Sequence, residues 1–167
     1  MSESKPTVVR TKNRFLKPLA IVVVVLGGFT YFALQIVFYN PNYVVQADDA
    51  VLFEIRNKQM VALIGVGMTP PETRGKAREL AQQLILHRYI RVELGQKPED
   101  KETKRLLAYV FADTPQGEVF FNEILIRKGY ARSEPAAPNL KYRAILDAAE
   151  AAARSEHLGI WADSKGN

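Results

Sequence analysis

Residues 60–94 decide the fold, and they read MVALIGVGMTPPETRGKARELAQQLILHRYIRVEL. The run from Met60 to Val66 is rich in β-branched residues and predicts a strand. From Gly75 to His87 the apolar residues recur at helical spacing, which predicts an amphipathic helix. Tyr89 to Leu94 alternates apolar and polar residues and predicts a second strand. A helix inserted between strands indicates an α+β fold.

The sequence on either side adds three more strands. Val51 to Arg56 precedes the polar turn 57–59, so it predicts a hairpin with the strand that starts at Met60. Leu106 to Ala112 and Glu118 to Phe121 flank the turn 113–117 and predict a second hairpin. The chain therefore contains five expected strands.

Helices dominate the C-terminal part. A short helix over 122–128 is stopped by Gly129, a proline-containing loop covers 131–139, and a longer helix over 140–157 is ended by Gly159. The long helix carries one charged stripe with i,i+4 pairs and a small-residue face that we expect to lie against a sheet. The stripe is Arg143, Asp147, Glu150 and Arg154, and the small residues are Ala144, Ala148 and Ala152. Five strands and about three covering helices fit a small, OB-type β-barrel.

The composition excludes several classes of site. The 167 residues are 47% hydrophobic, which supplies one compact domain and an additional element. Cysteine is absent, so a disulfide framework, a thiolate metal site and a cysteine nucleophile are excluded. The net charge is +5, but the first 38 residues hold five basic residues against one glutamate. The remainder is almost neutral, which argues against a nucleic-acid-binding surface.

An uncharged apolar run from Pro18 to Phe38 predicts a transmembrane helix over 18–39. At 1.5 Å per residue, such a helix is roughly as long as the hydrocarbon layer is thick. The basic segment 1–17 before it predicts an N-terminus in the cytosol or matrix, by the positive-inside bias. Further anchor residues are a possible helix-packing notch at Gly27 and Gly28, the interfacial Tyr31 and the amide Gln35. A cleaved signal peptide ending near Ala47 is the alternative.

The order of motifs resembles the staphylococcal nuclease-like family of domains. The similar pieces are the strand 61–66 followed by Thr69-Pro-Pro-Glu72, the strand Arg105-Leu-Leu-Ala-Tyr-Val110, the Asn122-Glu123 helix with its Gly-Tyr-Ala exit, and the Gly-Ile-Trp ending at Trp161. The resemblance implies a domain over 48–162, a juxtamembrane linker over 40–47 and a tail over 163–167.

Active members of this family are calcium-dependent nucleases, and the resemblance implies which residues would perform that chemistry here. Ala62 stands where the family has a catalytic arginine, and Gly67 stands where it has a calcium-binding aspartate. The positions that still match are Asp49 and Thr69 for calcium, and Glu72 and Arg105 for catalysis. Loss of one preorganised donor to a transition-state anion costs roughly 10² to 10³ in rate.

Each matching residue also has a structural interpretation. Thr69 and Glu72 fit a capping box, Arg105 fits a solvated or ion-paired strand residue, and Asp49 fits a turn. We therefore expect an inactive domain, without a cofactor, that acts as an accessory subunit of a larger inner-membrane complex, either bacterial or mitochondrial, with a respiratory complex as one setting. It would lie in the periplasm or intermembrane space. The alternatives are an active calcium-dependent nuclease and a non-catalytic oligonucleotide-binding module.

Overall fold

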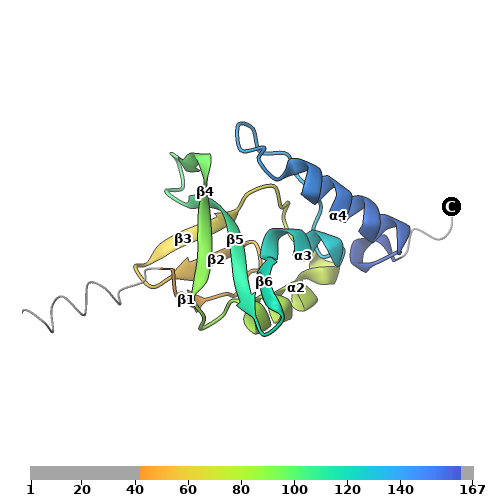
Figure 1. Ribbon diagram of the computed structural model, residues 1–167, viewed down its shortest axis with the longest axis horizontal. Coiled ribbons are helices and arrows are strands. Elements are labelled where there is room, and N and C mark those ends of the chain that lie inside the picture. The colour runs from red at the N-terminus through yellow and green to blue at the C-terminus, as the bar shows by residue number, and fades with distance from the viewer. Residues whose placement is uncertain (1–41, 163–167) are drawn as a thin grey trace, which may run out of the picture. The chain divides into compact units, whose positions relative to one another are not determined.

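The structure is a computed structural model that describes residues 42–162. Within the unit that starts at Asn40, one mixed sheet has the order β1-β2-β3-β5-β4, and β6 pairs with β5 (Figure 1). The strands are β1 (Val44–Gln46), β2 (Leu52–Ile55), β3 (Gln59–Leu63), β4 (Ile90–Glu99), β5 (Leu106–Thr114) and β6 (Gly117–Phe120). The helices are α2 (Pro71–Leu84), α3 (Phe121–Arg127) and α4 (Arg143–Ser155), followed by the short 3₁₀ helix η1 (Gly159–Trp161).

The two outer strands of the sheet meet, so the sheet closes into a barrel. Tyr43 forms an antiparallel bridge with Tyr89, and Val44 N donates a 3.0 Å hydrogen bond to Arg88 O. His87 N donates back to Val44 O at 3.0 Å. Closure pairs the edges that an open sheet would expose. The predicted α+β, OB-type barrel with about three helices is confirmed at this level.

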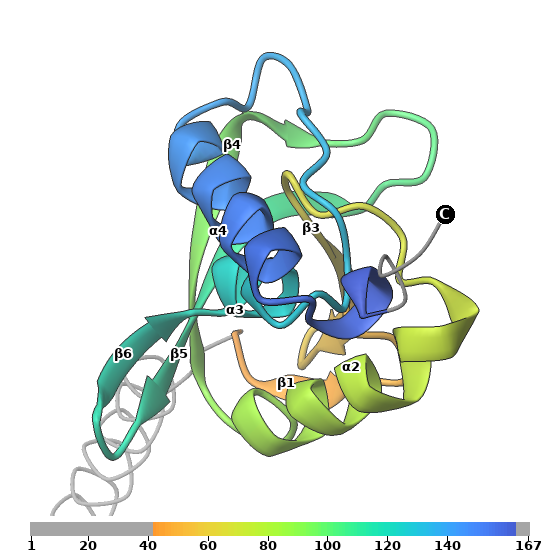
Figure 2. The same cartoon turned by 90° about the vertical axis from the view of Figure 1, so that its right-hand side faces the viewer.

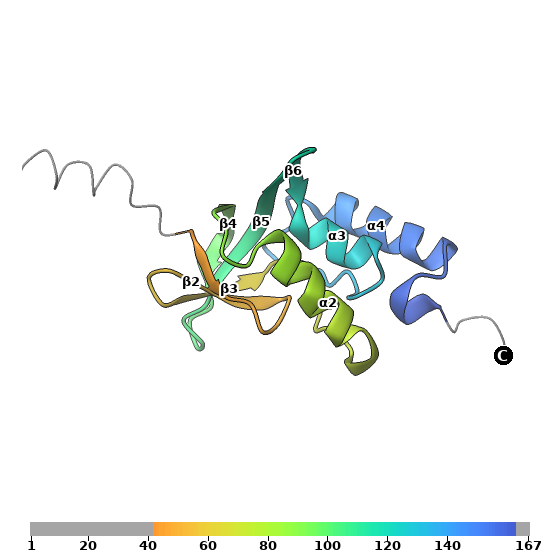
Figure 3. The same ribbon diagram turned by 90° about the horizontal axis from the view of Figure 1, so that it is seen from below.

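Helix α2 covers one end of the barrel, as the view from below shows (Figure 3). Ala77 and Ala81 are fully buried on its inner face, among apolar residues from the strands. Small residues at this face let the helix axis approach the sheet closely. The largest fully buried apolar side chains of this core are Phe53, Ile55, Val61, Ile85, Val110, Phe121 and Leu125.

A buried asparagine attaches α3 to the barrel. The side chain of Asn122 has no exposed surface; its Oδ1 accepts from Val110 N and its Nδ2 donates to Ile64 O, each at 2.9 Å. These bonds satisfy backbone groups where β3 has already ended but β5 continues. Helix α4 lies against α3 on the outer side (Figure 2).

Two predictions about strands and linkers are wrong. The sheet has six strands, because Val44–Gln46 pairs with β2 and Val44 is completely buried. The segment 40–47 is therefore not simply a linker. Its three-residue strand follows Asn40-Pro41-Asn42. Because these three residues favour a turn, the sequence pattern predicts a linker here and no strand.

The small-residue face of α4 is also placed differently from the prediction. Leu146, Ala149 and Ala153 are the buried residues of this helix, whereas Ala144 and Ala148 are exposed. The helix packs through the strip that contains its single leucine, since that side chain buries more apolar area than alanine. The predicted charged stripe is confirmed, with Arg143–Asp147 and Glu150–Arg154 ion pairs at 3.3 and 2.8 Å.

The predicted anchor over 18–39 lies outside the described residues, as do the tails 1–17 and 163–167. Between residues 42 and 162, no helix is long and apolar enough to cross a membrane.

Candidate functional site

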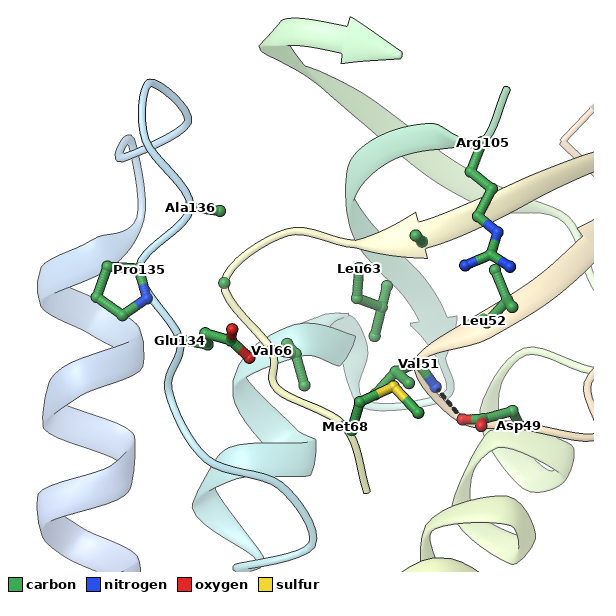
Figure 4. Close-up of a pocket in the computed structure, with 12 residues that line it drawn as sticks. Asp49, Val51, Leu52, Leu63, Val66, Met68, Arg105, Glu134, Pro135 and Ala136 are labelled. Carbon is green, nitrogen blue, oxygen red and sulfur yellow. Dashed lines mark hydrogen bonds between the residues drawn. The ribbon is translucent and has the colours of Figure 1, made fainter. Parts of the chain in front are cut away.

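The main cavity of the domain, about 550 Å³ in volume, opens beside β2 and β3. Its wall combines the β1–β2 connection, the β3–α2 connection, the start of β5 and the loop that precedes α4 (Figure 4). Most of the lining is apolar, and none of the twelve lining residues is aromatic. The charged residues in the wall are Asp49, Arg105 and Glu134.

Two of the predicted site residues reach this cavity. Asp49 lies half-buried before β2, where its Oδ1 accepts a 2.9 Å hydrogen bond from Val51 N, so the predicted turn role is confirmed. Arg105 precedes β5 and extends its guanidinium toward the cavity (Figure 4). Arg105 is exposed, and among residues 42–162 no side chain or backbone group pairs with its guanidinium, so of the two structural interpretations, solvated or ion-paired, the structure supports the solvated one.

Glu134 lies where a side chain at position 67 would project. A Cβ built on Gly67 would lie 3.0 Å from Glu134 Oε2. The proximity follows from the backbone, because Gly67 N donates to Arg132 O and Glu134 N donates to Gly65 O, both at 3.0 Å. A carboxylate thus borders the space over Gly67, but it comes from the loop 131–139.

The remaining predicted residues do not converge on the cavity as a catalytic set. Ala62 lines it from β3 with only a methyl group. Glu72 is exposed in the first turn of α2 and does not line it. Thr69 is 3% exposed, and its Oγ1 has no hydrogen-bond partner within residues 42–162. The predicted capping box is therefore wrong: Pro70 is the N-cap residue, without a side-chain cap.

The fit of a calcium ion can be judged from the donors present. Calcium takes six to eight oxygen ligands, of which carboxylates supply the charge. Asp49 and Glu134 are the two carboxylates of the cavity wall. Over the part of the chain that the structure describes, no group of three or more acidic, histidine or cysteine side chains is arranged to hold a metal ion. Two carboxylates leave the remaining ligand positions of such an ion to backbone carbonyls and water.

Sequence reasoning missed Glu134 but does identify Met68 as an inserted residue. Met68 is an additional residue after Gly67 and is 74% exposed at the cavity wall. Glu134 sits in a loop with Pro135 and Pro138, and no local pattern pairs that loop with residues 65–67. The available signal was the loss of the aspartate at position 67, which left room for a carboxylate from elsewhere.

A polar cluster holds the loop and α4 against the sheet. Lys141 Nζ and Tyr142 Oη donate to the two carboxylate oxygens of Glu93 at 2.6 and 3.0 Å. The hydrogen bond from Lys141 lowers the pKa of Glu93, and the one from Tyr142 acts in the same direction. Tyr109 Oη donates to Asn139 O at 2.9 Å, and burial raises the pKa of this phenol. These bonds fix the C-terminal end of the segment that carries Glu134.

A barrel of this topology, closed where β1 and β4 meet and with a helix between β3 and β4, is an OB-type barrel with an inserted helix. A family model described as "Staphylococcal nuclease homologue" matches residues 71–163, more than half of the chain. The chain belongs to this family.

Two curated relatives agree with the assignment. The chain is 31% identical over 131 residues to a protein named thermonuclease from Staphylococcus intermedius, covering 74% of this chain and 75% of the relative. It is 27% identical over 133 residues to a thermonuclease from Staphylococcus hyicus, covering 75% and 76%. The similarity therefore extends across the barrel and its helices.

Proposed function

We propose that this chain is a membrane-anchored, non-catalytic member of the staphylococcal nuclease family that serves as an accessory subunit of an inner-membrane complex. The proposed loss of catalysis is supported chiefly by the charge of the cavity. Its wall holds Asp49 and Glu134 against a single cation, Arg105. A phosphodiester entering it would face two carboxylates and one guanidinium.

The electrostatics disfavour phosphoryl-transfer chemistry in this cavity. Hydrolysis of a phosphodiester requires positive charge next to the oxygens on which negative charge develops. Ala62 provides a methyl group at the strand position of the family's arginine, and Glu134 brings an additional negative charge toward position 67. A calcium ion that would reverse the sign of the field would find only these two carboxylates as charged ligands in the described cavity wall.

The shape of the cavity supports a role in protein contact. Single-stranded nucleic acids are commonly held by aromatic side chains on which bases stack, and this cavity wall has none. Its apolar wall and the exposed Met68 are more typical of surfaces that bind proteins.

The accessory-subunit role is tested by mild detergent extraction of the native membrane, followed by native-size separation and identification of co-migrating chains. We expect the chain in the membrane fraction after an alkaline carbonate wash, in one large assembly of fixed composition. Recovery as a free monomer or small homo-oligomer would contradict the proposal. Recovery in the soluble fraction would contradict the anchor as well.

The second candidate is an active, calcium-dependent nuclease. It is favoured by the 31% identity to a thermonuclease and by the retention of Asp49, Thr69, Glu72 and Arg105. In this case a residue outside the cavity would have to replace the missing guanidinium, and Arg56 and Arg74 are the arginines that the sequence offers. Calcium-dependent cleavage lost in Glu72→Ala would establish it.

A further inference from the structure

We propose that a cationic and aromatic cluster at the closure of the barrel is a docking surface for anionic lipid headgroups. The seam cluster consists of Tyr43, Arg56, His87 and Tyr89. It lies where β1 and β4 meet, away from the residues that line the main cavity. The proposal rests on the proposed membrane anchor. It assigns a function to a surface that lies outside the cavity.

The cluster is built rigidly from three segments of the chain. The rings of Tyr43 and Tyr89 are 5.1 Å apart, and the rings of Tyr43 and His87 are 6.4 Å apart. The guanidinium carbon of Arg56 lies 4.6 Å from the Tyr43 ring and 5.6 Å from the Tyr89 ring. Arg56 N donates to Tyr43 O at 2.8 Å, so the backbone fixes the arginine beside the rings.

The charge around the seam cluster is positive and open to solvent. Arg56, Lys58 and Arg88 are exposed, and none of them forms an ion pair within residues 42–162. Glu54 is the one carboxylate of β2; it is half-buried and likewise has no ion-pair partner in that range. In contrast, the exposed Arg91, Arg127 and Arg154 each pair with a glutamate.

Chain length favours a lipid surface over other partners. Only residues 40–42 separate position 39, the end of the proposed anchor, from Tyr43, and the four Cα–Cα steps between them span at most about 14 Å. The cluster therefore stays within reach of the headgroup region. Tyrosine, with its apolar ring and polar hydroxyl, suits that region, and cations near an anionic leaflet gain about 1 kcal/mol each.

The test uses the full chain in lipid vesicles and exploits the absence of cysteine. Asn57→Cys places a fluorescent probe beside the seam cluster, and Ser155→Cys places the same probe at the end of α4. Vesicles of phosphatidylcholine, with or without phosphatidylglycerol, carry a headgroup-attached quencher. Arg56→Gln removes the cluster's cation, Arg56→Lys retains it, and Arg74→Gln removes an equal charge from α2 as the matched control.

We expect stronger quenching at position 57 than at position 155, and more of it with phosphatidylglycerol. Arg56→Gln should lower the ratio of docked to undocked domain about fivefold, whereas Arg74→Gln and Arg56→Lys should leave it nearly unchanged. Equal quenching at both positions, or equal effects of Arg56→Gln and Arg74→Gln, would overturn the docking surface. So would a position-57 probe that is shielded but not quenched, which would indicate a protein partner.

Flotation of the same vesicles separates the two proposals. Failure of the chain to float with them after a carbonate wash would overturn the anchor, and the docking surface with it. Flotation without the expected quenching would overturn the docking surface alone.

Discussion

At the scale of a single residue, the proposed loss of the metal site depends on Gly67. The family has a calcium-binding aspartate at the matching position, and here Glu134 lies against the space that such a side chain would enter. An aspartate at position 67 would join Asp49 and Glu134 in the same cavity region. Three carboxylates repel one another when no cation is present and attract a hard cation when one is.

Gly67→Asp should therefore make stability dependent on calcium. Without calcium, we expect a loss of about 1 kcal/mol in the free energy of unfolding, from crowding and like charge. With calcium, the melting temperature should rise, because the ion binds only the folded state. Thermal unfolding with and without calcium checks this.

The matched control is Gly75→Asp, because a Cβ at Gly75 would meet no atom within 4 Å. Its stability should not depend on calcium. If calcium raised the melting temperature of the unmodified chain as well, the native cavity would already hold the ion, and the proposed loss of the metal site would be wrong.

Asn122 is the residue on which the junction of α3 and the barrel depends. Asn122→Ala would leave Val110 N and Ile64 O buried without their partners. Each unsatisfied buried group costs about 1–3 kcal/mol, so we expect a loss of about 3 kcal/mol. Urea unfolding measures this loss of stability. The control is Asn57→Ala, at an exposed turn residue, for which we expect a loss of about 0.5 kcal/mol or less. Similar losses in both variants would contradict the buried role.

At the scale of elements, η1 packs on the end of α3 through two glycines. A Cβ on Gly159 would lie 2.0 Å from Gly129 O, and Ile160 N donates to that same oxygen at 2.9 Å. Both glycines have positive φ angles, +67° and +56° for Gly129 and Gly159. The Gly-Tyr-Ala and Gly-Ile-Trp motifs of the sequence are thus the two sides of one backbone contact.

Gly159→Ala should destabilise the domain more than backbone strain alone would. Gly117 also has a positive φ, +119°, but a Cβ there would meet nothing within 4 Å, so Gly117→Ala carries only strain of about 1–3 kcal/mol. We expect Gly159→Ala to cost about 2 kcal/mol more, because the clash adds to the strain. Equal melting temperatures for the two variants would show that the contact is dispensable.

The attachment of α4 to β4 should depend on pH through Glu93. Its pKa is lowered in the folded state, chiefly by the hydrogen bond from Lys141, so its contribution is present above the unfolded pKa of about 4.3 and is lost as pH falls. Because both partners are partly exposed, Glu93→Gln should cost at most about 1 kcal/mol at neutral pH.

Thermal unfolding of the unmodified chain and Glu93→Gln should therefore differ at pH 7 and converge below about pH 4. Glu102→Gln, an exposed residue outside the ion pairs of residues 42–162, is the control. A difference that persisted unchanged at low pH would contradict the charge-based attachment.

The elements differ in how well the sequence predicts them. The strands that start near Leu52, Gln59, Ile90 and Leu106 follow clear alternation or β-branched runs, so their positions were predictable. Strand β1 was missed because three residues are too short to show a period. The face of α4 was misassigned because alanine is compatible with both exposed and buried positions, and only the position of Leu146 in space decides between them.

The candidate site was predictable only where its residues are local. Asp49 follows from its turn and Arg105 from its strand, and both reach the cavity. Glu134 was not predictable, because its position over Gly67 depends on the pairing of segments about 67 residues apart along the chain. Contacts of this kind are set by tertiary structure, to which local patterns are insensitive.

At the scale of the whole molecule, we propose that the chain keeps the fold of the family without its activity. The barrel, its covering helices and the match over residues 71–163 place the chain in the nuclease family. The cavity that the fold provides nevertheless carries two carboxylates and one arginine. A fold defines where chemistry can occur, whereas the side chains in the cavity decide whether it does.

The proposed loss of catalysis is tested by assaying the full chain in detergent for cleavage of single-stranded DNA and RNA, with calcium and with a chelator. Glu72→Ala and Arg105→Ala serve as the variants that would abolish a genuine activity. We expect the same background cleavage in all samples, with no dependence on calcium. Cleavage that requires calcium and disappears in either variant would contradict it and establish the chain as a nuclease.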